Sequence, residues 1–185
     1  MSESGLNWSR IARRIRVPLG FVFAIVFFWL ARPALWSIVA GACVVALGVW
    51  IRAIASGHVD KNAALAMSGP YAYTRNPLYL GSIVIAIGFA IAALSIWIAL
   101  ILLLMFVGIY VPVIRSEEAF LKSKFPEYRA YSERVPRLIP RLRSANANTG
   151  SFSRELYLKH REYNALAGSA AMLAALVLKF FYLRG

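Results

Sequence analysis

The feature that most constrains this sequence is a long apolar stretch in its middle. Residues 78–114 contain no Asp, Glu, Lys, Arg or His. One straight helix of this length would extend about 55 Å, nearly twice the hydrocarbon thickness of a bilayer, which is about 30 Å. The stretch therefore predicts two membrane-spanning helices joined by a turn near residues 92–95.

Three further apolar runs cover residues 17–31, 34–51 and 165–183. Arg32-Pro33 separates the first two with a charge and a helix-stopping residue, so we expect a helical hairpin there. The first run follows polar and basic residues without a small-residue cleavage site, which favours a spanning helix over a cleaved signal peptide. The sequence thus predicts an all-α, polytopic membrane helix bundle of about five transmembrane helices.

The composition supports a lipid environment. Of all side chains 60% are hydrophobic and only 16% are charged, with a mean hydropathy of +0.62. This is more apolar surface than a soluble core of this size can bury. A soluble helical bundle is the alternative, but it would need charges spread along its helices, whereas here they are gathered into a few stretches.

The charges also predict an orientation. A net charge of +13 would suggest nucleic acid if the basic residues formed one face, but they flank the apolar runs, which favours anionic lipid. With the N-terminus in the cytoplasm, every Lys and Arg except Arg32, Lys179 and Arg184 lies on the inner side. We therefore expect an integral protein of an inner or plasma membrane, with a cytoplasmic N-terminus and an active site at the cytoplasmic face.

The sequence gives no sign of a metal site. Cys43 is the single cysteine and lies within an apolar run, and the two histidines, His58 and His160, are far apart in the sequence. Metal centres usually draw several such ligands from a short stretch. We therefore predict no metal cofactor and no disulfide within the chain.

The first of two long inner segments, residues 56–77, is interrupted by Gly69-Pro70 and Asn76-Pro77. Both dipeptides punctuate helices, so we expect exposed peptide groups just before the chain returns to the membrane at Leu78. Such groups can bind a polar ligand. The alternative is a membrane-surface turn whose Tyr71, Tyr73 and Tyr79 belong to the interfacial aromatic belt.

The second inner segment, residues 115–143, begins with Arg115 and two adjacent carboxylates, Glu117 and Glu118. Neighbours on a helix point about 100° apart, so one carboxylate can face the bundle while the other meets solvent or an arginine. An amphipathic helix along the membrane should follow, although such helices are often only solvated charged surfaces. The apolar positions with helical spacing are Phe120, Leu121, Phe125 and Tyr128.

Together the two segments resemble the isoprenylcysteine carboxyl methyltransferases and the phospholipid N-methyltransferases. The motifs that carry the resemblance are Gly69-Pro70-Tyr71, Arg75-Asn76-Pro77-Leu78-Tyr79-Leu80-Gly81, Arg115 with Glu117-Glu118, Phe125-Pro126-Glu127-Tyr128-Arg129-Ala130-Tyr131, and Val135-Pro136 with Pro140. Their order and separation match over roughly residues 45–140. Asn76 stands where the family usually has His, and Pro126 where it usually has Gly.

The resemblance implies an integral membrane enzyme that transfers a methyl group from S-adenosyl-L-methionine to a membrane-borne acceptor, either a prenylcysteine-like carboxylate or a lipid head group. Arg115 or Arg75 would hold a carboxylate acceptor, and Glu118 would take the proton from an amine acceptor. The cofactor would be bound by Ala63, Ala64, Leu65, Ala66, Tyr71, Asn76, Pro77, Leu78, Tyr79 and Glu117.

The predicted organisation is a methyltransferase core over residues 1–143, with motifs in 56–81 and 112–140, a flexible linker over 144–153, and a C-terminal helix over 154–185 that lies outside the resemblance. A soluble Rossmann-type methyltransferase is disfavoured, because the sequence contains no G-x-G-x-x-G after a strand. Two alternatives remain: an NADPH-dependent membrane reductase related to the sterol reductases, and a non-enzymatic membrane scaffold.

Overall fold

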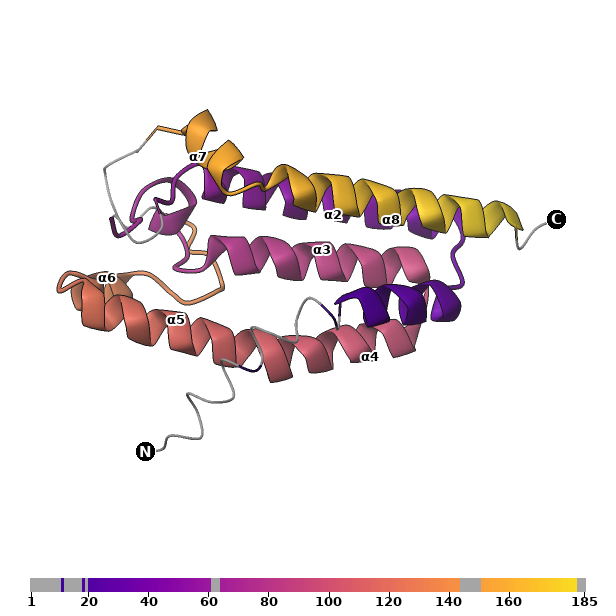
Figure 1. Ribbon diagram of the computed structural model, residues 1–185, viewed down its shortest axis with the longest axis horizontal. Helices are drawn as coiled ribbons and strands as arrows, with labels where there is room; N and C mark the ends of the chain where they lie inside the picture. Colours follow the sequence, from indigo (N-terminus) through magenta and orange to yellow (C-terminus); the bar gives the residue numbers. More distant parts are fainter. Residues whose placement is uncertain (1–10, 12–17, 19, 61–63, 144–150, 183–185) are drawn as a thin grey trace. The chain divides into compact units, whose positions relative to one another are not determined.

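The computed structural model describes residues 11, 18, 20–60, 64–143 and 151–182, and over these residues the chain forms helices and connecting segments without a strand. This confirms the all-α prediction. In chain order (Figure 1), the elements are the helix Gly20–Leu30, α2 (Leu35–Ser56), a 3-10 turn (Gly69–Ala72), α3 (Pro77–Ala93), α4 (Ile96–Met105), a π-helical segment (Phe106–Tyr110), α5 (Val111–Lys124), α6 (Tyr128–Arg134), α7 (Arg154–Lys159) and α8 (Tyr163–Tyr182).

Both predicted interruptions of the apolar runs are confirmed. The long stretch turns between Ala93, the last residue of α3, and Ile96, the first of α4. Leu94 makes this turn with a φ of 47°, a conformation uncommon for a residue other than glycine. The predicted break at Arg32-Pro33 is also present, because the chain is non-helical from Ala31 until α2 begins at Leu35.

Three helices are long and apolar enough to cross a membrane: α2, the continuous helical run Ile96–Lys124, and α8. Gly20–Leu30 and α3 are apolar but shorter. The structure therefore supports a membrane protein with three candidate spans by length and composition, and the count of five crossings stays a prediction.

The helical pattern predicted beyond Glu118 is divided between two elements. Phe120 belongs to α5, which continues from α4 through the π-helical segment and ends at Lys124, whereas Tyr128 is the first residue of α6. Pro126 explains the break, because proline disfavours a helical conformation in the residue before it and cannot donate a backbone hydrogen bond.

The chain divides into two compact units. Unit 1 comprises Met1–Val45, Ala86–Ala119 and Ala170–Gly185, and unit 2 comprises Ala46–Ile85 and Phe120–Ser169. Each of α2, α3, α5 and α8 contributes residues to both units. The predicted boundaries at residues 143 and 153 stay a prediction, and residues 144–150 of the predicted linker lie outside the described part of the chain.

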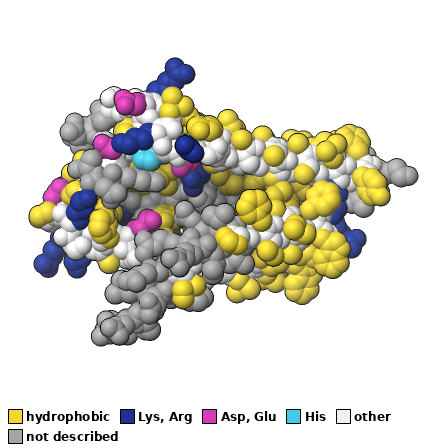
Figure 2. Space-filling model, viewed as in Figure 1, with side chains coloured by type: hydrophobic (Ala, Val, Ile, Leu, Met, Phe, Trp, Pro, Cys, Tyr) yellow, Lys and Arg dark blue, Asp and Glu magenta, His cyan; other side chains and the backbone are white. Residues whose placement is uncertain are grey.

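Unit 1 has an apolar core and an apolar surface. Its buried cluster consists of Phe27, Ala31, Ala92, Ala93, Ile98 and Leu176. Many large apolar side chains of the same unit are exposed, among them Ile25 at 73% and Leu104 at 70%. Figure 2 shows many yellow side chains on the visible surface of α4 and along the C-terminal part of α8. Such a surface is suited to lipid.

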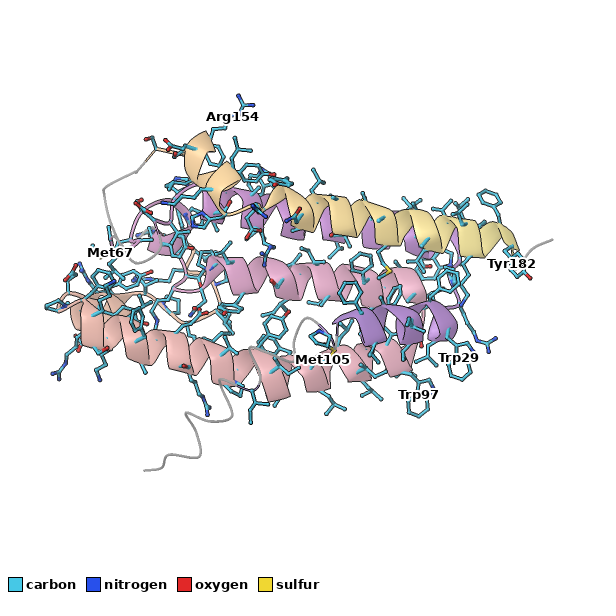
Figure 3. The ribbon with its side chains drawn as sticks, viewed as in Figure 1. Trp29, Met67, Trp97, Met105, Arg154 and Tyr182 are labelled. Atoms are coloured by element: carbon cyan, nitrogen blue, oxygen red, sulfur yellow. The ribbon has the colours of Figure 1, made fainter. Side chains whose placement is uncertain are left out.

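Aromatic side chains surround the hairpin turns of unit 1. Trp29 and Trp97, labelled in Figure 3, line a cavity of about 420 Å³ together with Leu30, Arg32 and residues 94–96. Lys179 donates to the backbone oxygens of Phe28 and Trp29. Tryptophan next to a cationic side chain at the end of apolar helices is typical of the membrane–water interface.

Helices α2 and α3 approach each other closely in both units because glycines face each other. In unit 1, a Cβ atom added to Gly41 would lie 2.5 Å from the backbone oxygen of Gly88. In unit 2, one added to Gly48 would lie 2.7 Å from the backbone oxygen of Gly81. Small residues at such positions let membrane helices make extensive van der Waals contact.

Candidate functional site

The first motif segment of unit 2 forms a tight turn against a histidine ring. Gly69 begins the 3-10 turn with a φ of +55°, which favours glycine. A Cβ atom at Gly69 would lie 2.4 Å from Cδ2 of His58, so the ring lies directly against the glycine backbone. His58 is fixed in turn by a 2.8 Å hydrogen bond between its Nδ1 and the backbone oxygen of Ile54.

The segment between this turn and α3 is hydrogen-bonded to the segment that follows α6. The backbone N–H of Arg75 donates to the oxygen of Pro136 over 2.9 Å. The side-chain amide of Asn76 donates to the backbone oxygen of Arg137 over 3.1 Å. Asn76 thus makes a neutral hydrogen bond where the resembling families usually carry His, and it joins two motif segments far apart in sequence.

Further hydrogen bonds extend the same junction. The hydroxyl of Thr74, which is 2% exposed, donates to the backbone oxygens of Arg137 and Leu138, each over 3.2 Å. The backbone N–H of Arg141 donates to the oxygen of Tyr73 over 3.0 Å. Residues 73–76 and 136–141 therefore form one hydrogen-bonded structure within unit 2.

A buried tyrosine also links the motifs. The hydroxyl of Tyr131 donates to the backbone oxygen of Tyr71 over 2.7 Å, and both residues are buried. Tyr131 also forms an apolar cluster with Tyr128 and Val135. The sequence motif contains Tyr131, but its pattern alone gave this residue no role, because the oxygen it contacts lies 60 residues away.

The predicted cofactor-binding stretch 63–66 is described in part. Ala63 lies outside the described residues, Ala64 is exposed, and Ala66 is half-buried. The half-buried side chain of Leu65 packs against the cluster of Tyr128, Tyr131 and Val135. Leu65 therefore has a packing contact of its own, and backbone contacts from this stretch to a ligand stay a prediction.

The first turn of α3 carries three predicted cofactor residues. Pro77 is buried, whereas Leu78 and Tyr79 are half-buried. The backbone oxygen of Leu78 accepts a 3.0 Å hydrogen bond from the hydroxyl of Ser82 and a 3.2 Å hydrogen bond from Nη1 of Arg52. The sequence pattern indicates no role for Arg52 beyond that of an inner-face charge, because this residue lies at the end of an apolar run.

The remaining predicted residues lie on α5 and belong to unit 1. Glu118 is buried, with 8% of its surface exposed, whereas Glu117 and Arg115 are exposed. The adjacent carboxylates therefore differ in exposure as predicted from helical geometry. The described residues of the predicted site thus form two groups: Ala64, Leu65, Ala66, Tyr71, Arg75, Asn76, Pro77, Leu78 and Tyr79 in unit 2, and Arg115, Glu117 and Glu118 in unit 1.

Among the residues that the structure describes, no three His, Cys, Asp or Glu side chains are arranged to hold a metal ion. His58 and His160 both lie in unit 2. Neither belongs to such a group.

Two curated relatives match the chain over 69% of its length. The cobalt-zinc-cadmium resistance protein CzcN of Cupriavidus metallidurans is 34% identical over 136 residues, and the nickel-cobalt-cadmium resistance protein NccN of Alcaligenes xylosoxydans xylosoxydans is 36% identical over 135 residues. The matched region spans 62% of each relative's own length.

No solved structure matches the chain significantly. Residues 36–128, which contain the turn at Gly69, the first turn of α3 and the paired glutamates, match the phospholipid methyltransferase family. This match covers half of the chain and confirms the resemblance that the motifs carry. The protein therefore belongs to the phospholipid methyltransferase family, a family of integral membrane methyltransferases that includes the isoprenylcysteine carboxyl methyltransferases.

Proposed function

We propose that this protein transfers a methyl group from S-adenosyl-L-methionine to a membrane-embedded acceptor at the cytoplasmic face. The observation that carries the proposal is the junction of family motifs in unit 2. Tyr131 holds the backbone of Tyr71, and Asn76 holds the backbone of Arg137. A preorganised backbone next to the first turn of α3 is what a site for a polar cofactor requires.

The residues suit the cofactor chemically. The carboxylates of Glu117 and Glu118 offer acceptors for ribose hydroxyls or for the cofactor's amino group. The ring of Tyr79 offers an aromatic face to a sulfonium. S-adenosyl-L-methionine would supply an activated methyl group, and the family to which this chain belongs generally uses it.

Methyl transfer from a sulfonium is an in-line displacement that releases the neutral thioether S-adenosylhomocysteine. It neutralises charge with a carboxylate acceptor and moves the positive charge to nitrogen with an amine acceptor, so in both cases the protein chiefly has to align the acceptor and exclude water. For a carboxylate acceptor, Arg115 or Arg75 would hold the negative oxygen in line. For an amine acceptor, the buried carboxylate of Glu118 is the candidate general base, because the nitrogen must lose a proton to become nucleophilic.

The deciding experiment is calorimetric titration of the detergent-purified full chain with S-adenosylhomocysteine, the product of methyl transfer. We expect saturable binding that Glu118→Gln and Glu117→Gln each weaken, with radioactive methyl transfer into extracted membrane lipids. A parallel titration with NADPH tests the reductase. Binding of NADPH alone would replace the proposal with a reductase, and binding of neither would favour a scaffold.

The names of the relatives suggest where to search for the acceptor. Both are named as metal resistance proteins, so we propose comparing methyl incorporation into lipid and protein fractions of cells grown with and without cobalt or cadmium. An acceptor in the lipid fraction would support a head group, whereas incorporation into a prenylated peptide would support a carboxylate. Incorporation into neither fraction would contradict a membrane-borne acceptor.

A further inference from the structure

A single arginine connects three elements of unit 2. Arg52, near the end of α2, donates from Nε and Nη2 to both carboxylate oxygens of Glu162, over distances of 2.8–3.0 Å. Its Nη1 donates to the backbone oxygen of Leu78 over 3.2 Å and to the hydroxyl of Ser82 over 2.5 Å. One guanidinium thus holds both Glu162 and the first turn of α3.

This ion pair is largely withdrawn from solvent. The side chain of Glu162 is 9% exposed and that of Arg52 is 23% exposed. A two-oxygen contact between guanidinium and carboxylate fixes direction as well as distance. Because removal of one partner leaves a desolvated charge without compensation, the two residues depend strongly on each other.

The motif glycine of α3 makes room for the arginine. A Cβ atom at Gly81 would lie 2.6 Å from Cγ of Arg52, closer than two carbon atoms can approach. Ser82 follows directly, and its hydroxyl donates to the backbone oxygen of Leu78. On α3, Gly81 therefore leaves space for the side chain of Arg52, and Ser82 accepts a hydrogen bond from it. Both residues lie next to the predicted cofactor residues Leu78 and Tyr79.

The turn between α7 and α8 presents the glutamate. Arg161 has a φ of 53°, a backbone conformation that carries strain in a residue other than glycine. The N–H of Asn164 donates to the oxygen of Arg161, and the N–H of Ala165 donates to the oxygen of Glu162, each over 3.0 Å. Glu162 is thus held in a structured turn, and it lies outside the segment, residues 36–128, that matches the family.

We propose that Glu162 is a positioning residue for the cofactor site: through Arg52 it orients the Leu78–Ser82 turn, so that the C-terminal segment completes a site whose motifs lie elsewhere. This inference rests on the proposed function for its readout of S-adenosylhomocysteine binding. Its structural part, the order of the Leu78–Ser82 turn, can be measured without any cofactor.

A second ion pair of the same segment provides a matched control. Lys159 contacts Asp60 through one 3.2 Å hydrogen bond, and their side chains are 62% and 42% exposed. This pair also connects the C-terminal segment to the region after α2, but it does not reach α3. Lys159→Ala therefore removes a charged contact of the segment without touching the Leu78–Ser82 turn.

The test compares Glu162→Gln, Arg52→Lys and Lys159→Ala in the full chain, purified in detergent. Hydrogen exchange of the amides of residues 78–82, thermal unfolding, and affinity for S-adenosylhomocysteine are measured for each variant. We expect Glu162→Gln to accelerate exchange in this turn and to weaken affinity roughly tenfold, since small misplacements of binding groups are costly. Arg52→Lys, which keeps the charge, should lose less affinity, and Lys159→Ala should match the wild type.

Two results would overturn the positioning role. One is unchanged exchange in residues 78–82 and unchanged affinity in Glu162→Gln, even if its unfolding temperature falls, because Glu162 would then only anchor the C-terminal segment. The other is an equal loss in Lys159→Ala. If the wild type fails to bind S-adenosylhomocysteine, the proposed function fails, while faster exchange confined to Glu162→Gln and Arg52→Lys still supports the orientation of the turn.

Discussion

Each of the two units of this protein is stabilised internally by a different kind of interaction. In unit 1, Phe27, Ile98 and Leu176 form an apolar cluster, and large apolar side chains remain exposed around it. In unit 2, a small apolar cluster around Tyr131 is accompanied by side-chain hydrogen bonds to backbone oxygens, as with Tyr131 and Asn76. Apolar packing suffices for a lipid-facing scaffold, whereas a binding surface needs its backbone fixed in one conformation.

The close approach of α2 and α3 is shared by both units. A substitution that disrupts it should lower the free energy of unfolding the most. Gly48→Leu places a side chain where the first added carbon already lies 2.7 Å from the backbone oxygen of Gly81. Since backbone atoms must move to accommodate it, we expect a loss of about 3 kcal/mol in the free energy of unfolding. Thermal unfolding in detergent measures this loss.

Gly168→Ala is the control for that substitution. No atom of the described residues lies within 4 Å of a Cβ added at Gly168 on α8, so this variant should be as stable as the wild type or gain up to about 1 kcal/mol in helix propensity. Equal losses in both variants would contradict the assignment of the effect to the contact between α2 and α3.

The next largest effect should follow from removing the buried hydroxyl of Tyr131. Tyr131→Phe keeps the apolar ring in its cluster but leaves the backbone oxygen of Tyr71 without this donor. We expect a loss of about 1–2 kcal/mol in the free energy of unfolding, with faster hydrogen exchange in residues 69–76. Unchanged exchange there would mean that the junction of the motifs does not depend on this bond.

A buried hydrogen bond also occurs in unit 1, and removing it can be compared with the removal of the Tyr131 hydroxyl in unit 2. The hydroxyl of Ser37, which is fully buried, donates to the backbone oxygen of Ala92 over 3.1 Å and accepts from the N–H of Ala34 over 3.0 Å. Ser37→Ala should cost about 1 kcal/mol. Because Ser37 belongs to unit 1, its loss should leave exchange in residues 69–76 unchanged, in contrast to Tyr131→Phe.

The sequence could predict the features that depend on local pattern and on membrane thickness. The turn after Ala93 follows from the length of the apolar stretch, and the break before α2 follows from the charge and proline at Arg32-Pro33. The motifs also identified the family correctly. These features need only neighbouring residues or a known pattern, so no tertiary contact had to be known in advance.

The contacts that build the candidate site could not be predicted in this way. Asn76 bonds a backbone oxygen 61 residues away, and Arg52 pairs with Glu162 across 110 residues. Every residue carries a backbone oxygen, so the sequence does not indicate which oxygen a side chain will contact. The contact is identified only in the folded structure. The sequence does place Arg52 at the end of an apolar run, where a charge often pairs with an acid, but it does not indicate which acid.

Removal of the exposed ion pair between Lys159 and Asp60 should cause the smallest loss of stability. Lys159→Ala removes a contact to Asp60 in which both side chains are solvent-accessible, so water already screens the attraction and we expect less than about 0.5 kcal/mol of lost stability. Thermal unfolding at low and high salt measures it. The small loss should vanish at high salt, whereas the effect of Glu162→Gln should persist because its ion pair is withdrawn from solvent. A loss in Lys159→Ala as large as that in Glu162→Gln would show that the C-terminal segment is held by its charges collectively, and not chiefly through Arg52.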